Sequence, residues 1–147
     1  MSTLYSVGSF DFRVSSPGTR QYQVLIANRS SLSSAYFGGA TAPVTTTTAH
    51  KPYTARFYTP TVRRGQTAVA ELGVAPAFSG KVSLQRWNGK TWTGVKDVAI
   101  NQGYAKGTFP ANLLGRVAYR YYVPARTWKG LVVAAAYSPN FVLTTIR

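Results

Sequence analysis

Apolar and polar residues alternate along short stretches of the chain from about residue 53 onward. Every even-numbered residue from 68 to 74 is apolar, whereas the odd-numbered residues beside them are mixed in character. The same alternation recurs between Val117 and Val123. A period of two residues is typical of a β-strand with one buried face, and no stretch keeps apolar residues at helical spacing. The pattern therefore predicts an all-β fold.

Glycine, proline and asparagine divide this region into six or seven expected strands. Pro110 and Pro124 each end a strand, and Asn88-Gly89 signals a two-residue hairpin because both positions tolerate positive φ. The expected strands cover residues 55–59, 66–74, 81–87, 104–109, 117–123 and 140–146, with a return strand that starts near Thr91. Many short strands separated by turns indicate a sandwich or a barrel. We expect residues 50–147 to form a complete antiparallel β-sandwich.

The first 49 residues look like a second copy of the end of the chain. Residues 18–24 align with residues 115–121 at an offset of 97 residues, sharing a glycine and a tyrosine. Four further positions correspond at this offset: Phe12 with Phe109, Ile26 with Val123, Thr45 with Val142, and Thr47 with Thr144. An offset of 97 residues is the size of one sandwich domain. The sequence therefore predicts that residues 1–49 are a partial module of about three strands, ending in a linker over residues 49–52.

Three strands cannot enclose a sandwich core by themselves, and they leave an open sheet edge. Three arrangements follow. The chain is a fragment cut through a domain, or another chain completes the partial module, or its strands pack on the complete domain as an extra layer. The open edge of the partial module predicts a protein partner or self-association.

The segment from Gly80 to Trp92, GKVSLQRWNGKTW, carries a family resemblance. It has the form Gly-x-Val-x-Leu-Gln-Arg followed by a hairpin and a tryptophan, with Gly103 and the pair Tyr119-Arg120 further along. This pattern resembles the bacterial immunoglobulin-like modules of secreted actinobacterial proteins. The resemblance covers residues 62–146 and, more weakly, residues 7–48. It implies an immunoglobulin-like β-sandwich outside the cell or on its surface, serving as a spacer, adhesive or binding unit.

Several aromatic residues have expected structural roles within such a sandwich. Tyr119 resembles the tyrosine corner, in which a buried ring anchors a turn through its hydroxyl, and Tyr22 is its counterpart in the partial module. We expect Trp92 to fill the core between the sheets. Trp87 has the opposite parity to the inward-facing residues of its strand, so we expect it to be exposed at the hairpin.

The charge of the chain is strongly unbalanced. Seventeen lysines and arginines face three acidic residues, which gives a formal net charge of +14. Such an excess attracts polyanions, including nucleic acid, anionic wall polymers and acidic polysaccharides, although it can also serve solubility alone. The cations are spread singly, with Arg63-Arg64 the one adjacent pair, so the sequence does not indicate a basic tail.

The sequence also bears on targeting. No apolar run approaches 18 residues, so we expect no membrane insertion. The first residues do not combine a basic start with an apolar block and do not predict a signal peptide. The secreted or cell-surface location therefore depends on the family resemblance, and we expect this chain to be a processed piece or fragment of an exported protein.

Catalytic chemistry has little support in the sequence. The carboxylates Asp11, Glu71 and Asp97 are widely separated, and His50 is expected to be a solvated linker residue. The absence of cysteine excludes disulfides and cysteine-ligated metals. We predict a protein that is not an enzyme and that has no catalytic, metal or cofactor site.

Strand parity suggests one candidate binding face. If Val82, Leu84, Tyr119 and Tyr121 point inward, the residues between them point outward, and the two strands are neighbours in an immunoglobulin-like sandwich. The candidate face consists of Lys81, Gln85, Trp87, Arg120 and Tyr122. A flat basic and aromatic surface can stack on a sugar or hold a phosphate polymer. The alternatives are an ordinary solvated face or an interface with the first 49 residues.

The leading functional prediction is a non-catalytic extracellular or cell-surface module, structural or adhesive, that acts through protein–protein assembly. The alternative is a polyanion-binding protein that uses its positive charge on an anionic wall polymer, an acidic polysaccharide or nucleic acid. A small basic protein of ribosomal type is a third class, but such proteins usually carry lysine-rich tails, whereas this chain has 14% aromatic residues and no charge run.

Overall fold

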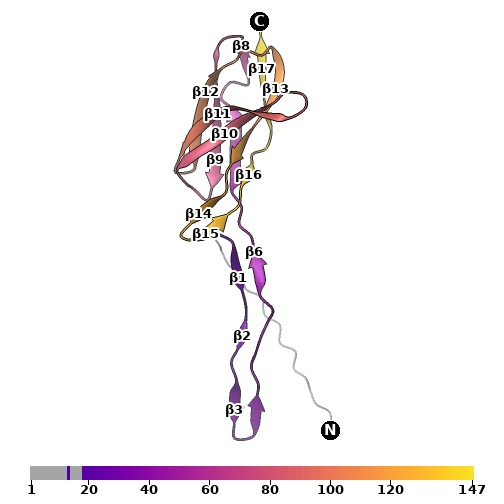
Figure 1. Ribbon diagram of the computed structural model, residues 1–147, viewed down its shortest axis with the longest axis vertical. Coiled ribbons are helices and arrows are strands. Elements are labelled where there is room, and N and C mark those ends of the chain that lie inside the picture. The colour runs from indigo at the N-terminus through magenta and orange to yellow at the C-terminus, as the bar shows by residue number, and fades with distance from the viewer. Residues whose placement is uncertain (1–12, 14–17) are drawn as a thin grey trace.

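The computed structural model describes residue 13 and residues 18–147. The correspondence expected at Phe12 and the weaker resemblance over residues 7–12 lie outside the described residues. Within the described part, every regular element is a strand. These strands form a β-domain over residues 50–147 and a long hairpin, here called the arm, over residues 18–48 (Figure 1). The expected all-β fold is confirmed.

One large mixed sheet builds the β-domain. Its strands, in order across the sheet, are β7 (Lys51–Phe57), β9 (Thr67–Ala75), β12 (Tyr104–Pro110), β11 (Trp92–Asn101), β10 (Gly80–Trp87), β13 (Gly115–Val123), β17 (Phe141–Ile146) and β8 (Thr61–Arg63). Neighbours pair antiparallel except β17 and β8, which run parallel. The short β16 (Ala136–Tyr137) adds to β13, while β14 (Arg126–Trp128) and β15 (Leu131–Val133) pair with each other. The sheet curls, so that its two halves face each other (Figure 1).

The core lies between these two halves. The even-numbered residues 68–74 of β9 are all buried, as their alternation predicts. Tyr121 of β13 is fully buried, and its hydroxyl donates across the core to the carbonyl oxygen of Ala70 at 3.1 Å. A cluster of rings fills one end of the core: Phe57, Phe109, Tyr119 and Phe141. The hydroxyl bond expected of Tyr119 is thus made across the core by Tyr121, two residues further along.

The tight turns differ from the expectation at one hairpin. The β10–β11 ladder ends at Trp87 and Trp92, so the loop has four residues and not two. Asn88 closes this loop, because its Oδ1 accepts bonds from the backbone N–H groups of the two residues before Trp92. A two-residue turn occurs instead between β11 and β12, at Gln102-Gly103, where both φ angles are positive, 46° and 81°. A glutamine at such a position is uncommon, so this turn is not apparent from the sequence.

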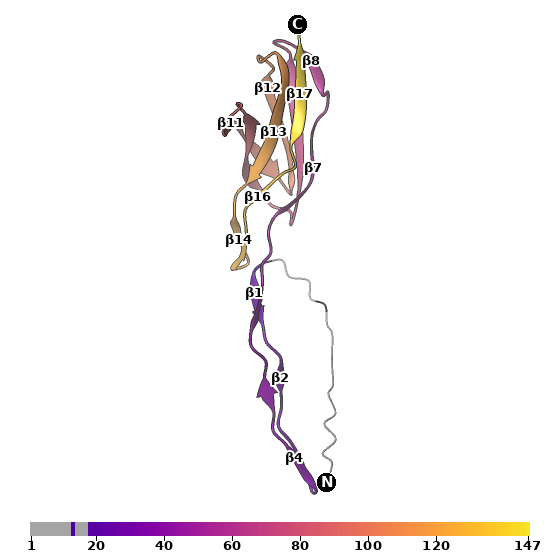
Figure 2. The ribbon, with the colours of Figure 1, turned by 90° about the vertical axis from the view of Figure 1, so that its right-hand side faces the viewer.

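The arm is a two-stranded antiparallel hairpin that folds back once, at residues 32–33. Its paired segments are β1 (Arg20–Tyr22) with β6 (Val44–Thr46), β2 (Leu25–Ile26) with β5 (Gly39–Ala40), and β3 (Arg29–Ser31) with β4 (Ser34–Tyr36). The arm projects away from the β-domain along the long axis of the molecule (Figures 1 and 2). The arm is therefore a two-stranded ribbon, whereas about three strands were expected. It does not pack on the domain as an extra layer.

The arm repeats the strand register of the last hairpin of the β-domain, residues 115–145. Every pair in the arm has a counterpart 97 residues later: Tyr22–Val44 matches Tyr119–Phe141, Leu25–Ala40 matches Tyr122–Tyr137, and Ser31–Ser34 matches Trp128–Leu131. Both hairpins also have two residues in the loop at the tip. The offset found in the sequence thus relates two segments with the same pairing.

The arm joins the domain through backbone hydrogen bonds. Ala134 donates its N–H to the carbonyl oxygen of Thr48 at 2.9 Å and accepts one from the N–H of His50 at 3.1 Å. On the other strand of the arm, the N–H of Thr19 donates to the carbonyl oxygen of Val132 at 2.9 Å. The expected linker over residues 49–52 is therefore wrong, because its second half begins β7 and its first half is bonded to the domain hairpin.

Candidate functional site

The surface with the clearest sign of a missing partner is one face of the arm. Alternation along β1, β2 and β6 places Tyr22, Val24, Ile26 and Val44 on the same side, which we call the apolar face. Ile26 and Val44 are 61% and 64% exposed. Their counterparts in the domain hairpin, 97 residues later, are buried in the core. The arm thus leaves in water side chains of the kind that the domain encloses.

Beyond its base, where Thr19 and Thr48 bond to the domain, the arm pairs with no further strand of the described chain. Within the described residues, β1 and β6 form a sheet with each other alone. In the domain, by contrast, β13 is bordered by β10 and β17 by β8. Unpaired strand edges beside exposed apolar side chains invite further strand pairing.

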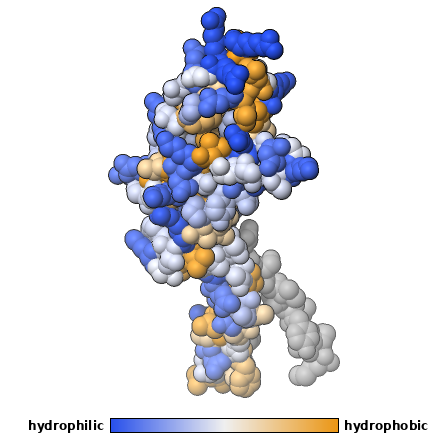
Figure 3. Space-filling view, turned by 45° about the horizontal axis from the view of Figure 1, so that its top comes forward, coloured by the Kyte–Doolittle hydropathy of each residue, from blue (hydrophilic) through white to orange (hydrophobic). Residues whose placement is uncertain are grey.

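The tip of the arm adds two more exposed apolar side chains. Leu32 lies in the turn, and Phe37 follows β4 with 92% of its surface exposed. The space-filling view shows apolar residues along the arm, whereas hydrophilic residues dominate the opposite end of the domain (Figure 3). On this face of the molecule, the arm is therefore more apolar than the domain end that carries Arg63, Arg64 and Arg147.

The structure brings most of the predicted sheet face together. Gln85 pairs with Arg120 across β10 and β13, and the Arg120 Nε donates to Gln85 Oε1 at 2.9 Å. Tyr122 lies two residues further along β13 and packs on Tyr137, with ring centroids 5.1 Å apart. Lys81 is exposed beside Tyr122 in a shallow hollow. Gln85, Arg120, Tyr122 and Lys81 thus lie together on one side of the sheet, as strand parity predicts.

Of the two tryptophans at this hairpin, the sequence placed Trp92 wrongly. Trp92 lies outside the core and stacks against Trp87, with ring centroids 5.5 Å apart. The Arg120 guanidinium carbon lies 4.3 Å from the Trp92 ring centroid and 3.9 Å from that of Tyr137. Trp92 fails to reach the core because it pairs with Trp87 at the hairpin end, on the outward side of the sheet. Trp87 is 40% exposed, as expected.

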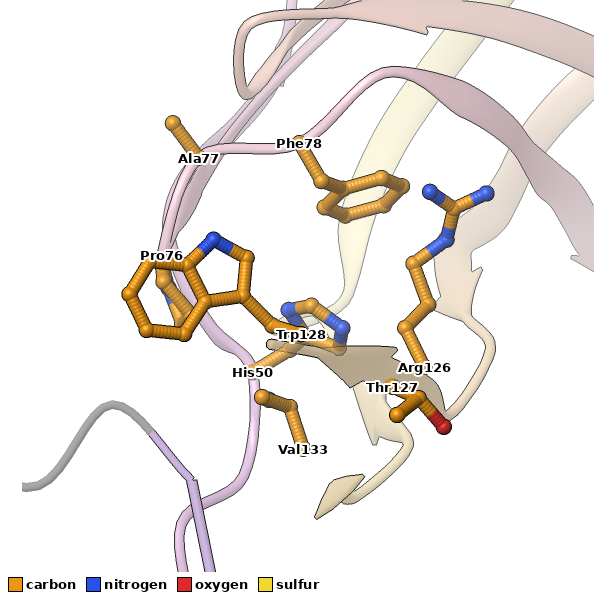
Figure 4. A pocket seen from close by; sticks show the side chains of 8 residues that line it. All are labelled: His50, Pro76, Ala77, Phe78, Arg126, Thr127, Trp128 and Val133. Carbon is orange, nitrogen blue, oxygen red and sulfur yellow. The ribbon is translucent and has the colours of Figure 1, made fainter. Parts of the chain in front are cut away.

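A small cavity lies where the arm meets the domain. It measures about 80 Å³ and is walled by His50, Phe78, Arg126 and Trp128, together with Pro76, Ala77, Thr127 and Val133 (Figure 4). The Arg126 guanidinium lies over the Phe78 ring at 4.3 Å and donates to the carbonyl oxygen of Ser79 at 2.6 Å. A cavity of this size holds a few water molecules but no drug-sized ligand.

His50 is buried in the wall of this cavity and is not the solvated linker residue that the sequence suggested. Its ring packs against Phe78 with centroids 4.8 Å apart, and neither ring nitrogen has a hydrogen-bond partner in the described part of the chain. Burial lowers the pKa of His50, and the nearby positive charge of Arg126 lowers it further. The folded protein therefore favours the neutral imidazole.

The two described carboxylates that the sequence considered for catalysis lie on strands separated by β12. Glu71 of β9 is buried, forms an ion pair with Arg56, and accepts a hydrogen bond from the Tyr104 hydroxyl at 2.8 Å. The bond from Arg56 lowers the pKa of Glu71. Asp97 is exposed on β11. The structure does not bring the two together as a pair.

Metal ligands and membrane spans were also sought. Among residue 13 and residues 18–147, no three histidine or acidic side chains gather where they could hold a metal ion. In the same residues, no helix is long and apolar enough to cross a bilayer.

No protein-family model matches this sequence, and no curated protein matches it.

The residues that sequence reasoning missed are those of the apolar face. A signal for them was present, because the offset of 97 residues places Ile26 over Val123, a core position.

Proposed function

We propose that this chain is a non-catalytic structural or adhesive module, outside the cell or on its surface, that acts through protein–protein assembly. The observation that carries the proposal is the arm, whose apolar face exposes Ile26 and Val44 and whose strands β1 and β6 pair, among the described residues, with each other alone. A two-stranded hairpin is marginally stable in water, so a partner that covers it gives it much of its stability.

Two further features support this proposal. The curled sheet, with β7, β9 and β12 facing β13 and β17, is compatible with an immunoglobulin-like sandwich, which is the fold that the Gly80–Trp92 segment resembles. The extracellular setting rests on that resemblance. A partner that adds a strand to β1 or β6 would use β-augmentation, in which backbone bonds give affinity and side-chain packing gives specificity.

The test compares two substitutions on neighbouring residues of β2. Ile26→Asp places a carboxylate on the apolar face, and Leu25→Asp places the same group on the opposite face, where Leu25 is also exposed. We expect the intact chain to self-associate as its concentration rises, because its apolar face has no other cover. Ile26→Asp should weaken association by about tenfold or more, because burying an unpaired carboxylate is costly. Light scattering after gel filtration measures the molar mass of the intact chain and of the variant as the concentration rises.

Leu25→Asp is the matched control and should change association little. An intact chain that remains monomeric at every concentration would contradict the proposal, as would two substitutions with equal effects.

A second candidate function, polyanion binding, is favoured by the end of the domain remote from the arm. Arg63 ends β8 beside Ile146, and the N–H of Arg64 donates to the carbonyl oxygen of Ile146 at 2.8 Å, so both arginines lie near the exposed Arg147. Binding to polyphosphate should weaken steeply as salt rises. Replacing Arg63 and Arg64 with serine should weaken it far more than replacing Arg20 and Arg29 of the arm, which removes the same charge elsewhere. Equal losses would count against a localised site.

A further inference from the structure

The likeness between the arm and the domain hairpin extends beyond strand pairing. In the domain, the N–H of Tyr121 donates to Ser138 Oγ at 2.8 Å, and the N–H of Ser138 donates to the Tyr121 carbonyl oxygen at 2.9 Å. In the arm, the N–H of Val24 donates to Thr41 Oγ1 at 3.1 Å, and the N–H of Thr41 donates to the Val24 carbonyl oxygen at 3.0 Å. The offset is again 97 residues. A hydroxyl thus replaces a ladder bond at the same place in both hairpins.

Side-chain character follows the same correspondence. Four core residues of the domain hairpin, each at most 8% exposed, have apolar counterparts on the apolar face: Tyr119 with Tyr22, Tyr121 with Val24, Val123 with Ile26, and Phe141 with Val44. In the domain these positions are covered by β7, β9 and β12. The arm therefore has the inward-facing pattern of a hairpin that closes a core.

A pair of residues whose sizes are exchanged between the two repeats supports a second core of the same design. Gly107 of β12 lies beside Tyr121, and a Cβ built on it would be 2.7 Å from Val98 Cγ2 and 3.5 Å from the Tyr121 hydroxyl. In the sequence, Phe10 stands 97 residues before Gly107, and Val24 stands 97 residues before Tyr121. In the sequence, the larger residue of the two thus stands at the first position in the first repeat and at the second position in the second repeat. An exchange of this kind conserves total volume in a core.

The order of elements along the chain indicates where the strands that would cover the arm lie. The domain hairpin is the last element of its module, and the arm leads directly into β7, the first strand of the domain. The domain hairpin also contacts the base of the arm, through the bonds from Ala134 to Thr48 and from Thr19 to Val132. By the same correspondence Phe37 matches Ala134, so the exposed tip of the arm would contact the base of a preceding hairpin.

A second copy of this chain is a poorer occupant for the apolar face. In a second copy, the domain hairpin already pairs with β10 and already fills the core. An exchanged arm would put Val44 in place of Phe141 and Thr46 in place of Leu143, which leaves cavities. A free sandwich body therefore fits the arm better than a complete domain does.

We propose that the arm is the closing hairpin of a second module of the same design, and that the body of that module, equivalent to residues 50–114, precedes the arm in the same polypeptide. This inference rests on the proposed function, in which the arm is an assembly element, and it names the partner. The protein is then a unit of a tandem array in which each hairpin completes one module and leads into the next.

The test extends the intact chain. A copy of residues 50–97 is placed directly ahead of Met1, which sets the added body 97 residues before the domain. In the domain, Gln85 pairs with Arg120, so Gln85 of the added copy should pair with Gln23 of the arm. Because the chain has no cysteine, Gln85→Cys in the added copy and Gln23→Cys provide a unique pair. Directly paired residues lie within disulfide range, and residues displaced by two positions do not.

We expect rapid oxidation to an intramolecular disulfide, and amide exchange in β1 and β2 slowed by about a hundredfold or more relative to the unextended chain. Gln21→Cys with the same partner is the control and should not cross-link. Failure to cross-link or to slow exchange, while residues 50–147 unfold as before, overturns the inference. Disulfides between chains overturn it too, and they leave the proposed assembly function standing. If the unextended chain shows no self-association that depends on Ile26, the proposed function is contradicted instead.

A second variant covers the case in which the added body does not fold. Residues 18–48 replace residues 115–145 in the domain, a substitution of equal length. If the arm is a closing hairpin, this domain folds cooperatively, with a lower urea midpoint than the parent. A domain that does not fold with the arm sequence, although it folds with Phe141→Val and Leu143→Thr alone, overturns the inference.

Discussion

The hairpin over residues 115–145 and the arm over residues 18–48 have the same strand register, yet one is enclosed and the other stands in water. Val123 is fully buried in the first, whereas Ile26, its counterpart, is 61% exposed in the second. The register is kept because backbone bonds and the two-residue tip set it within each hairpin. Burial differs because it depends on the strands supplied from elsewhere. The comparison separates what local pairing decides from what packing decides.

The largest expected difference concerns the one tyrosine that both hairpins share. Tyr119 packs among three phenylalanine rings, so Tyr119→Ala should cost about 3–5 kcal/mol, in the range of other large aromatic truncations. Tyr22→Ala in the arm should change the unfolding free energy of the domain by less than about 0.5 kcal/mol. Urea denaturation followed by tryptophan fluorescence measures both. Similar losses would mean that the arm contributes to the same cooperative unit.

A smaller difference is expected at the shared hydroxyl. Ser138 is buried, so Ser138→Ala leaves the N–H of Tyr121 without its acceptor and should cost about 1–3 kcal/mol. Thr41→Ala removes the matching bond to Val24 in an exposed setting, where water replaces it, and should cost little. The urea midpoints of the two variants decide the point, and a large loss for Thr41→Ala would show that the arm is already covered in solution.

The shared arginine should give a weaker contrast. Arg126 lies over Phe78 and bonds to the carbonyl oxygen of Ser79, so Arg126→Ala should cost about 1 kcal/mol. Arg29 occupies the matching place in the arm and is exposed, so Arg29→Ala should have no measurable effect. Thermal unfolding of both variants tests this pair.

The smallest expected change concerns pH, because one group is responsible. Burial lowers the pKa of His50, so below its ordinary value of 6.5 the unfolded chain takes up a proton before the folded chain does. Stability should therefore be full above about pH 7 and fall as the pH drops below the ordinary His50 pKa of 6.5. His50→Phe should remove this fall, whereas Arg126→Lys should keep it. A rise in stability on acidification would contradict the burial of a neutral His50.

Alternation predicted the strands of the domain well. The expected strands over residues 66–74, 81–87 and 117–123 lie within or close to the observed β9, β10 and β13, because each has one buried face. The three short strands β14, β15 and β16 were not foreseen. They form the extension of the last hairpin and have little buried surface to impose a pattern.

The candidate surfaces were predicted less well. Parity identified the sheet face that contains Gln85 and Arg120, since register within a sheet follows from alternation. It misplaced Trp92, because cross-strand pairing with Trp87 at the hairpin end decides where that ring lies. Burial of His50 was not predictable either. It arises from Phe78 and Arg126, residues distant in the sequence that the fold brings together.

The two ends of the domain lie far apart along its long axis, with β7 entering from the arm and β17 leaving at the opposite end (Figure 2). A pull on both ends would therefore be directed along the strands and across the bonds that join β17 to β13 and β8. The hydrogen bonds between the strands are then loaded at the same time as the strands are pulled past each other, and they do not open one after another. A chain of such units would withstand tension along its length.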